Sequence, residues 1–81
     1  MSTARPEADI REELRVLEED LARLRETAAS LRERIGERAD EPTDAAEHSA
    51  LIEGAEEQEF LADQLEARRE ELLAELGGGA S

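Results

Sequence analysis

The residues of this chain best suited to chemistry are three carboxylates gathered around a proline. Glu41 and Asp44 stand three positions apart on either side of Pro42, and Glu47 follows three positions later. Exposed carboxylates on a protruding turn can help to hold a hard cation such as Mg²⁺, which prefers oxygen ligands. Acidic residues are also common at turns and helix starts for purely structural reasons. Both interpretations of Glu41 and Asp44 stay open from these residues alone.

The rest of the sequence offers little that could carry out catalysis. His48 is the only histidine, cysteine is absent, and no serine stands in a catalytic motif. The glycines at positions 77–79 follow the end of a predicted helix, whereas phosphate-binding loops open one. We therefore expect no enzyme activity and no cofactor. We interpret His48 as a surface histidine among acids, because one imidazole with carboxylates lacks any specific metal-ligand spacing.

These carboxylates must be positioned by helices, because the sequence before them has a heptad pattern. Apolar residues recur alternately at four and three positions, which places them on one stripe of a helix. The stripe consists of Ile10, Leu14, Leu17, Leu21, Leu24, Ala28, Leu31 and Ile35. Pro6 suits the first turn of such a helix. The pattern therefore predicts a helix over residues 6–39.

Pro42 separates this helix from a second one. Proline lacks an N–H and pushes the preceding residue away from helical angles, so the first helix cannot continue. Asp44 with Glu47 resembles a capping box, which predicts a second helix over residues 44–76, ending at the glycines. Its apolar stripe is weaker. The stripe consists of Leu51, Gly54, Ala55, Gln58, Leu61, Ala62, Leu65, Leu72, Leu73 and Leu76.

The two stripes match when the chain is folded back at Pro42. The predicted fold class is all-α, a two-helix antiparallel coiled-coil hairpin with both termini at one end. This register pairs Leu17 with Leu65, Leu31 with Leu51, and Ala28 with Gly54 and Ala55. Residues 1–5 are expected to be disordered, 40–43 to form the tip loop, and 77–81 to form a flexible tail. We call the line along which the two apolar stripes meet the seam. A homodimer with four helices is an alternative, since two helices alone leave one flank of the seam partly exposed to water.

Charge narrows the range of partners. The chain has 23 acidic residues against 10 arginines, and its net charge is −13. Such a chain repels phosphate, so we expect no direct binding to nucleic acid or to an anionic membrane. No long apolar run and no leader segment is present, which predicts a cytoplasmic protein. The arginine-free stretch from Asp40 to Glu66 is either a solvated helix face or a surface for a basic partner.

Two apolar residues interrupt this acidic stretch. Ile52 and Phe60 are predicted to lie on the side of the second helix that faces away from its apolar stripe, surrounded by glutamates. Single exposed apolar side chains are ordinary on protein surfaces. Otherwise these two residues anchor a partner protein or a dimer.

The predicted tip resembles that of two families of bacterial transcription regulators. The stretch EPTDAA, from Glu41 to Ala46, resembles the coiled-coil tip of DksA-type regulators of RNA polymerase, with Glu in place of the first Asp. It is also similar to the tip of Gre-type transcript-cleavage factors. The positions that match the Gre pattern are Glu41, Asp44, Ala46, Glu47 and His48, followed along the second helix by Ala50, Glu53, Glu59, Leu65 and Glu66. The resemblance covers the coiled coil alone.

The resemblance implies a function. In both families the hairpin enters the secondary channel of RNA polymerase, and in Gre factors two tip acids assist a catalytic magnesium ion. That role would fall on Glu41 and Asp44. The leading hypothesis is therefore a regulator that binds bacterial RNA polymerase through its tip, with Glu47, Ile52 and Phe60 as further contact residues. The alternative is a structural or adaptor coiled coil that binds another protein or associates with itself.

Overall fold

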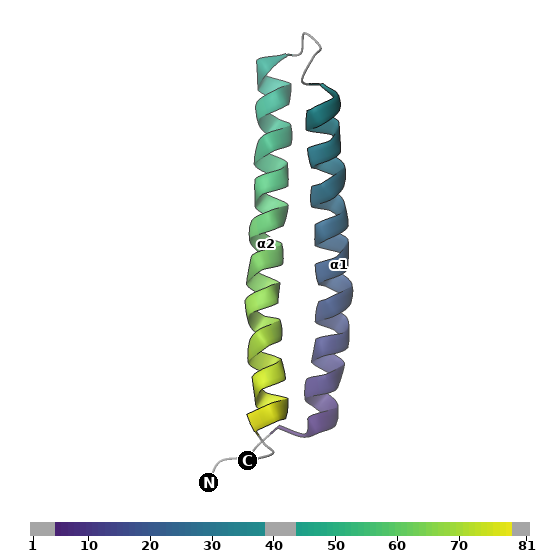
Figure 1. The fold of residues 1–81 in the computed structure, drawn as a ribbon, viewed down its shortest axis with the longest axis vertical. Coiled ribbons are helices and arrows are strands. Elements are labelled where there is room, and N and C mark those ends of the chain that lie inside the picture. Colours follow the sequence, from purple (N-terminus) through teal and green to yellow (C-terminus); the bar gives the residue numbers. More distant parts are fainter. Residues whose placement is uncertain (1–4, 39–43, 79–81) are drawn as a thin grey trace.

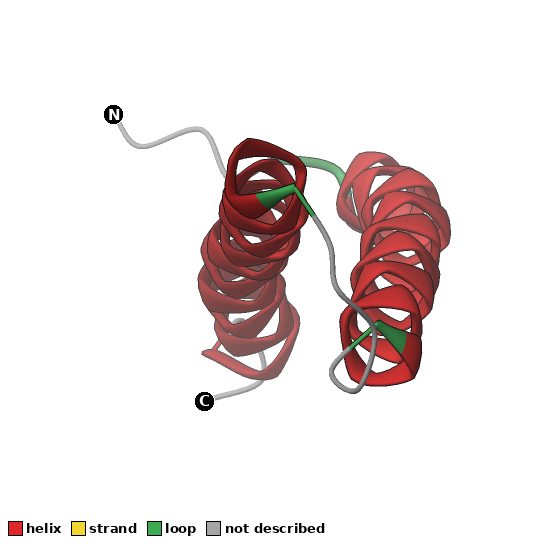
Figure 2. Ribbon diagram, turned by 90° about the horizontal axis from the view of Figure 1, so that it is seen from above, coloured by secondary structure: helices red, strands yellow, loops and turns green. Residues whose placement is uncertain are grey.

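The computed structural model describes residues 5–38 and 44–78, which form two long helices. Helix α1 spans Glu7–Glu37 and helix α2 spans Ala45–Gly78. The helices lie side by side and run in opposite directions (Figures 1 and 2). The molecule measures 62 × 18 × 17 Å, so it is a narrow rod. The predicted all-α antiparallel hairpin is confirmed.

The first turn of α1 follows from the proline that precedes it. Pro6 is the N-cap residue, and its carbonyl oxygen accepts hydrogen bonds from the N–H groups of Asp9 and Ile10 at 3.0 and 3.2 Å. The carboxylates of Glu7 and Asp9 lie in the first turn, where the positive end of the helix dipole favours them. Arg5, assigned to a disordered terminus from sequence, forms an ion pair with Glu13 at 2.8 Å.

The C-terminal end of α2 differs from the prediction. The sequence placed the end of this helix at Leu76 and assigned Gly77 and Gly78 to a flexible tail, but both glycines are helical. Glycine usually ends a helix by adopting a positive φ, and no described glycine has one. A glycine costs only about 1 kcal/mol relative to alanine within a helix, so two of them at an end do not prevent another half turn.

The seam of α1 faces α2 along its whole length. Its buried members are Ile10, Leu14, Leu17, Leu21 and Ala28. Leu24, Leu31 and Ile35 are half-buried. On α2 the buried residues are Ala55, Ala62 and Leu72, and Leu72 has no exposed surface. The half of the rod near Glu7 and Gly78 therefore contains the cluster of large buried side chains around Leu72.

The terminal half of the rod contains the apolar cluster that holds the helices together. Ile10, Leu14, Leu17 and Leu72 form this cluster, and Leu65 packs against it, which agrees with the predicted layer of Leu17 and Leu65. Each fully buried side chain of this size contributes roughly 1.5–3 kcal/mol. Nearer the tip, Leu31 lies against Gly54, where an added Cβ would be 3.6 Å from its Cδ1.

Two leucines of the predicted α2 stripe are not buried. Leu61 is 40% exposed and Leu73 is 42% exposed. Successive helical residues point about 100° apart, so neighbours cannot both face the partner helix. Ala62 and Leu72 take the inward positions, which leaves Leu61 on one flank of the seam and Leu73 on the other.

Candidate functional site at the acidic end of the rod

Asp44 has a structural role at the start of α2. Its side-chain Oδ1 accepts a hydrogen bond from the Ala46 N–H at 3.0 Å, and its main-chain carbonyl accepts one from the His48 N–H at 3.0 Å. These contacts make Asp44 the N-cap residue, which satisfies an N–H that the helix cannot. Its side chain is exposed at the end of the rod. A carboxylate has two oxygens, and the cap uses one of them. Glu41 lies outside the described residues.

Glu47 connects the two helices at the same end. Its carboxylate forms an ion pair with Arg38, which follows the last residue of α1. In the predicted capping box, Glu47 would instead reach back to the main chain of Asp44, and within the described part of the chain it makes no such hydrogen bond. The difference has an electrostatic reason, because a charge-assisted bond to a guanidinium is stronger than a bond to a neutral N–H.

His48 is less exposed than the sequence suggested. Its side chain is half-buried, and the Nδ1 atom is buried without a hydrogen-bond partner. His48 precedes the buried Ala55 by seven positions, which places it on the inner side of α2. Within residues 5–38 and 44–78, no group of three histidine or acidic side chains could hold a metal ion.

Ile52 and Phe60 do not share one exposed face. Phe60 is 60% exposed, whereas Ile52 is half-buried. Eight residues of helix rotate a side chain by about 80°, which separates the two directions. Ile52 instead shares the seven-residue spacing of Glu59 and Glu66. The predicted common patch is therefore wrong for Ile52, while Phe60 stays exposed among acids.

Ion pairs between the helices form a ladder that the sequence reasoning missed. Arg25 pairs with Glu66, and Arg32 pairs with Glu59. Arg32 donates from Nε at 3.0 Å and from Nη2 at 2.8 Å, one bond to each carboxylate oxygen. This two-point contact lowers the pKa of the Glu59 carboxyl below its ordinary value. The arginines are seven residues apart, and so are the glutamates, which is the signal that would have revealed the ladder.

Internal pairing leaves α2 with unneutralised acids. Within the described residues, every arginine except Arg34 forms an ion pair with a carboxylate of this chain. None of these pairs involves the exposed acids on the outer side of α2 around Phe60. We name these acids the acidic face, which consists of Glu53, Glu56, Glu57 and Asp63. The acidic face is free to attract a basic surface.

Neither helix, over the described residues, contains a stretch long and apolar enough to span a membrane. Comparison with protein-family models, with curated proteins and with solved structures gives no match. The resemblance to the channel-binding regulators therefore rests on the tip residues and on the hairpin geometry.

Proposed function

We propose that this protein regulates transcription by binding bacterial RNA polymerase, tip first, in the secondary channel. The observation that carries the proposal is the position of Asp44 and Glu47 at one end of a rod only 18 × 17 Å across, with Glu7 and Gly78 at the other end. A narrow rod of this kind can enter a channel that a globular domain cannot. Its leading end would then be acidic.

The charge distribution supports the same partner. Arg25 and Arg32 of α1 form ion pairs with Glu66 and Glu59, and none of the ion pairs in the described residues includes a member of the acidic face. A surface with unpaired carboxylates is attracted to a basic wall and repelled by nucleic acid. The acidic face would lie along the channel wall, and Phe60 would provide an apolar contact at its centre. Aromatic residues in such positions often dominate the affinity of an interface.

At the tip, Asp44 would act together with Glu41. One oxygen of Asp44 is held by the Ala46 N–H, which fixes the direction of the carboxylate. The other oxygen could then supplement the coordination of a magnesium ion that the polymerase holds. This chain would contribute ligands to that ion without binding it alone.

The experiment compares substitutions that change the same amount of charge at the two ends of the rod. Asp44→Asn keeps an oxygen for the cap and removes the charge from the tip. Asp9→Asn removes one charge near Glu7, at the end that would stay outside the channel. Binding to purified polymerase is measured at several salt concentrations, together with transcription and transcript cleavage. Asp44→Asn, alone or with Glu41→Gln, should weaken binding or the effect on transcription, and Asp9→Asn should change neither.

Salt dependence provides a second criterion. Binding of an acidic rod to a basic wall should weaken as ionic strength rises towards and beyond about 0.15 M, because exposed charges are screened. Binding that is absent, or that does not respond to salt, would refute the proposal. Equal activity of the doubly substituted protein and of Asp9→Asn would refute the role of the tip.

A further inference from the structure

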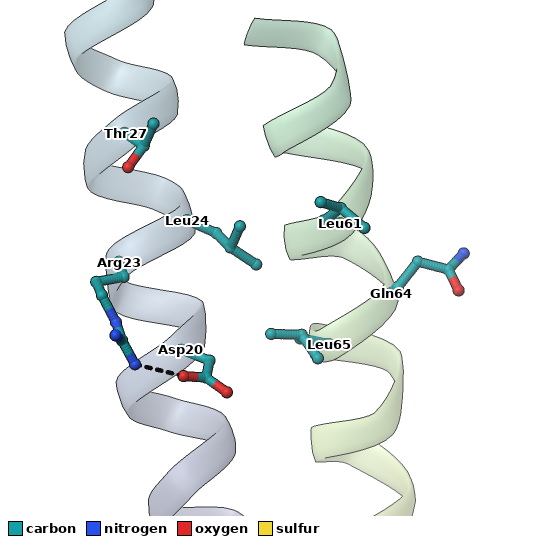
Figure 3. Close-up of a pocket in the computed structure, with 7 residues that line it drawn as sticks. All are labelled: Asp20, Arg23, Leu24, Thr27, Leu61, Gln64 and Leu65. Atoms are coloured by element: carbon teal, nitrogen blue, oxygen red, sulfur yellow. Dashed lines mark hydrogen bonds and ion pairs between the residues drawn. The ribbon is translucent and has the colours of Figure 1, made fainter. Parts of the chain in front are cut away.

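An apolar groove runs along one flank of the rod, midway between its ends. The groove has a volume of about 480 Å³. It is lined by Asp20, Arg23, Leu24, Thr27, Leu61, Gln64 and Leu65. Leu24 and Leu65 point towards each other across it from α1 and α2, and Gln64 points away (Figure 3). Large aliphatic side chains therefore form its floor.

The opposite flank has a smaller hollow of about 300 Å³, lined mainly by charged side chains. The pairs Arg25–Glu66 and Arg69–Glu18 lie there side by side. Asp20 and Thr27 of the groove are each two positions beyond Glu18 and Arg25, which turns them by about 200° to the other flank. None of the ion pairs in the described residues crosses between the helices within the groove. The groove is therefore lined mainly by uncharged side chains, whereas the hollow on the opposite flank is lined mainly by charged ones.

The groove is electrically neutral in a strongly acidic chain. Its two charged lining residues, Asp20 and Arg23, pair with each other at 2.5 Å. Two copies with a net charge of −13 each repel one another across most of their surfaces. The neutral groove is the surface where such copies can approach at the smallest electrostatic cost. A basic partner would gain nothing from a neutral groove and would be drawn to the acidic face instead.

Exposed aliphatic side chains beside the groove could fill the same groove on a second copy of the chain. Leu61 is 40% exposed beside it, and Val16, which is 42% exposed, lies on the same stripe of α1 as Asp20. A two-fold symmetric dimer needs one patch that fits a copy of itself, and a groove flanked by exposed aliphatic side chains meets this requirement. A heptad seam with one further apolar flank is also the pattern of helices in four-helix bundles.

We infer that two copies of this chain associate through the groove, with Leu61 of each copy packed into the groove of the other. The product is a four-helix assembly in which the ion-pair ladders stay on the outside. The interface is short. Towards the end of the rod that contains Glu7 and Gly78, the ion pair between Glu13 and Arg68 crosses between the helices and ends the apolar surface. A small interface predicts a weak dimer whose population rises with protein concentration.

The test compares two leucines of α2 that lie on opposite flanks of the seam: Leu61 lines the groove, and Leu73 lies on the other flank. Leu61→Gln and Leu73→Gln remove side chains of nearly equal exposure, 40% and 42%, without changing the charge. Analytical ultracentrifugation of the full chain over a range of concentrations gives the dimer dissociation constant. Leu61→Gln should raise this constant about tenfold or more, and Leu73→Gln should leave it nearly unchanged. Val16→Gln should act in the same direction as Leu61→Gln from the other helix.

Salt separates this association from binding to polymerase. Screening weakens the repulsion between two acidic copies, so the dimer should become stronger as salt rises. A wild-type chain that stays monomeric at all concentrations and at high salt would overturn the inference. Equal weakening by Leu61→Gln and Leu73→Gln would overturn the role of the groove. Circular dichroism confirms that each variant remains helical.

Discussion

Leu72 should contribute more to the stability of the hairpin than any other side chain of α2. It has no exposed surface and lies among Ile10, Leu14 and Leu17. Replacing a buried leucine by alanine costs about 2–5 kcal/mol, because the apolar contact is lost and a cavity remains. A domain of this size has roughly 3–5 kcal/mol of stability in total. Leu72→Ala should therefore remove most of the free energy of unfolding.

The adjacent residue gives the matched control. Leu73 is 42% exposed, so it loses much less buried surface on truncation and leaves no closed cavity. We expect Leu73→Ala to cost about 1 kcal/mol. Both substitutions replace leucine by alanine in the same turn of α2, so their effects on helix propensity are the same. The two variants should differ by about 1–4 kcal/mol, which corresponds to roughly 4 °C or more in the midpoint of thermal unfolding.

The measurement is thermal and urea unfolding of the wild type and both variants, followed by circular dichroism. Low protein concentration is needed, because a dimer would stabilise the folded state by mass action. Equal midpoints for Leu72→Ala and Leu73→Ala would show that the core does not close around Leu72. A larger effect of Leu73→Ala than of Leu72→Ala would show that Leu73, and not Leu72, is the residue buried against α1.

Two further predictions concern acid and local motion. The pKa of Glu59 is lowered by its hydrogen bonds from Arg32, so this pair stabilises the fold above the unfolded pKa, near 4.5, and loses that effect as pH falls through the folded pKa. Glu59→Gln should thus be less stable than the wild type near neutral pH and equal to it well below pH 4.5, and a pH-independent difference would contradict the ion-pair explanation. Hydrogen exchange should be faster for amides at 31–37 than at 10–21, because the seam is only half-buried near the tip. Uniform protection along α1 would contradict this gradient.

The fold was predictable because α1 contains a regular pattern. Its eight seam residues alternate at four and three positions without interruption, and all eight are buried or half-buried. Pro42 predicted the interruption that a hairpin needs. These two signals are local, so they do not depend on what the rest of the chain does.

The packing of α2 was less predictable, because its apolar residues come in adjacent pairs. In Leu61-Ala62 and in Leu72-Leu73, either member could face α1 as far as periodicity is concerned. The choice depends on the partner surface: Leu72 is buried among the apolar cluster of α1, and Ala62 is buried in place of Leu61. Contact with α1 decides which member of each pair is buried, and the sequence of α2 alone does not specify that contact.

The tip shows why residue type alone does not define a site. Asp44 fits a capping residue and a metal-assisting residue equally well in the sequence. The structure gives it the cap, through the hydrogen bond from Ala46, and leaves the second role as a proposal. The pairing of Glu47 with Arg38 was not predicted, because the spacing of Asp44 and Glu47 indicates a capping box and does not show which residue of the first helix lies opposite Glu47.

The use of the arginines links the fold to both proposed interactions. Arg25 and Arg32 on α1 pair with Glu66 and Glu59 of α2 on one flank of the seam, and no ion pair in the described residues includes Glu53, Glu56, Glu57 or Asp63. The same distribution leaves the opposite flank apolar and neutral at the groove. One arrangement of charge therefore creates two surfaces with opposite responses to salt: the acidic face and tip should bind less tightly as salt rises, and the groove should bind more tightly. A single salt titration, followed by both polymerase binding and dimer formation, distinguishes the two.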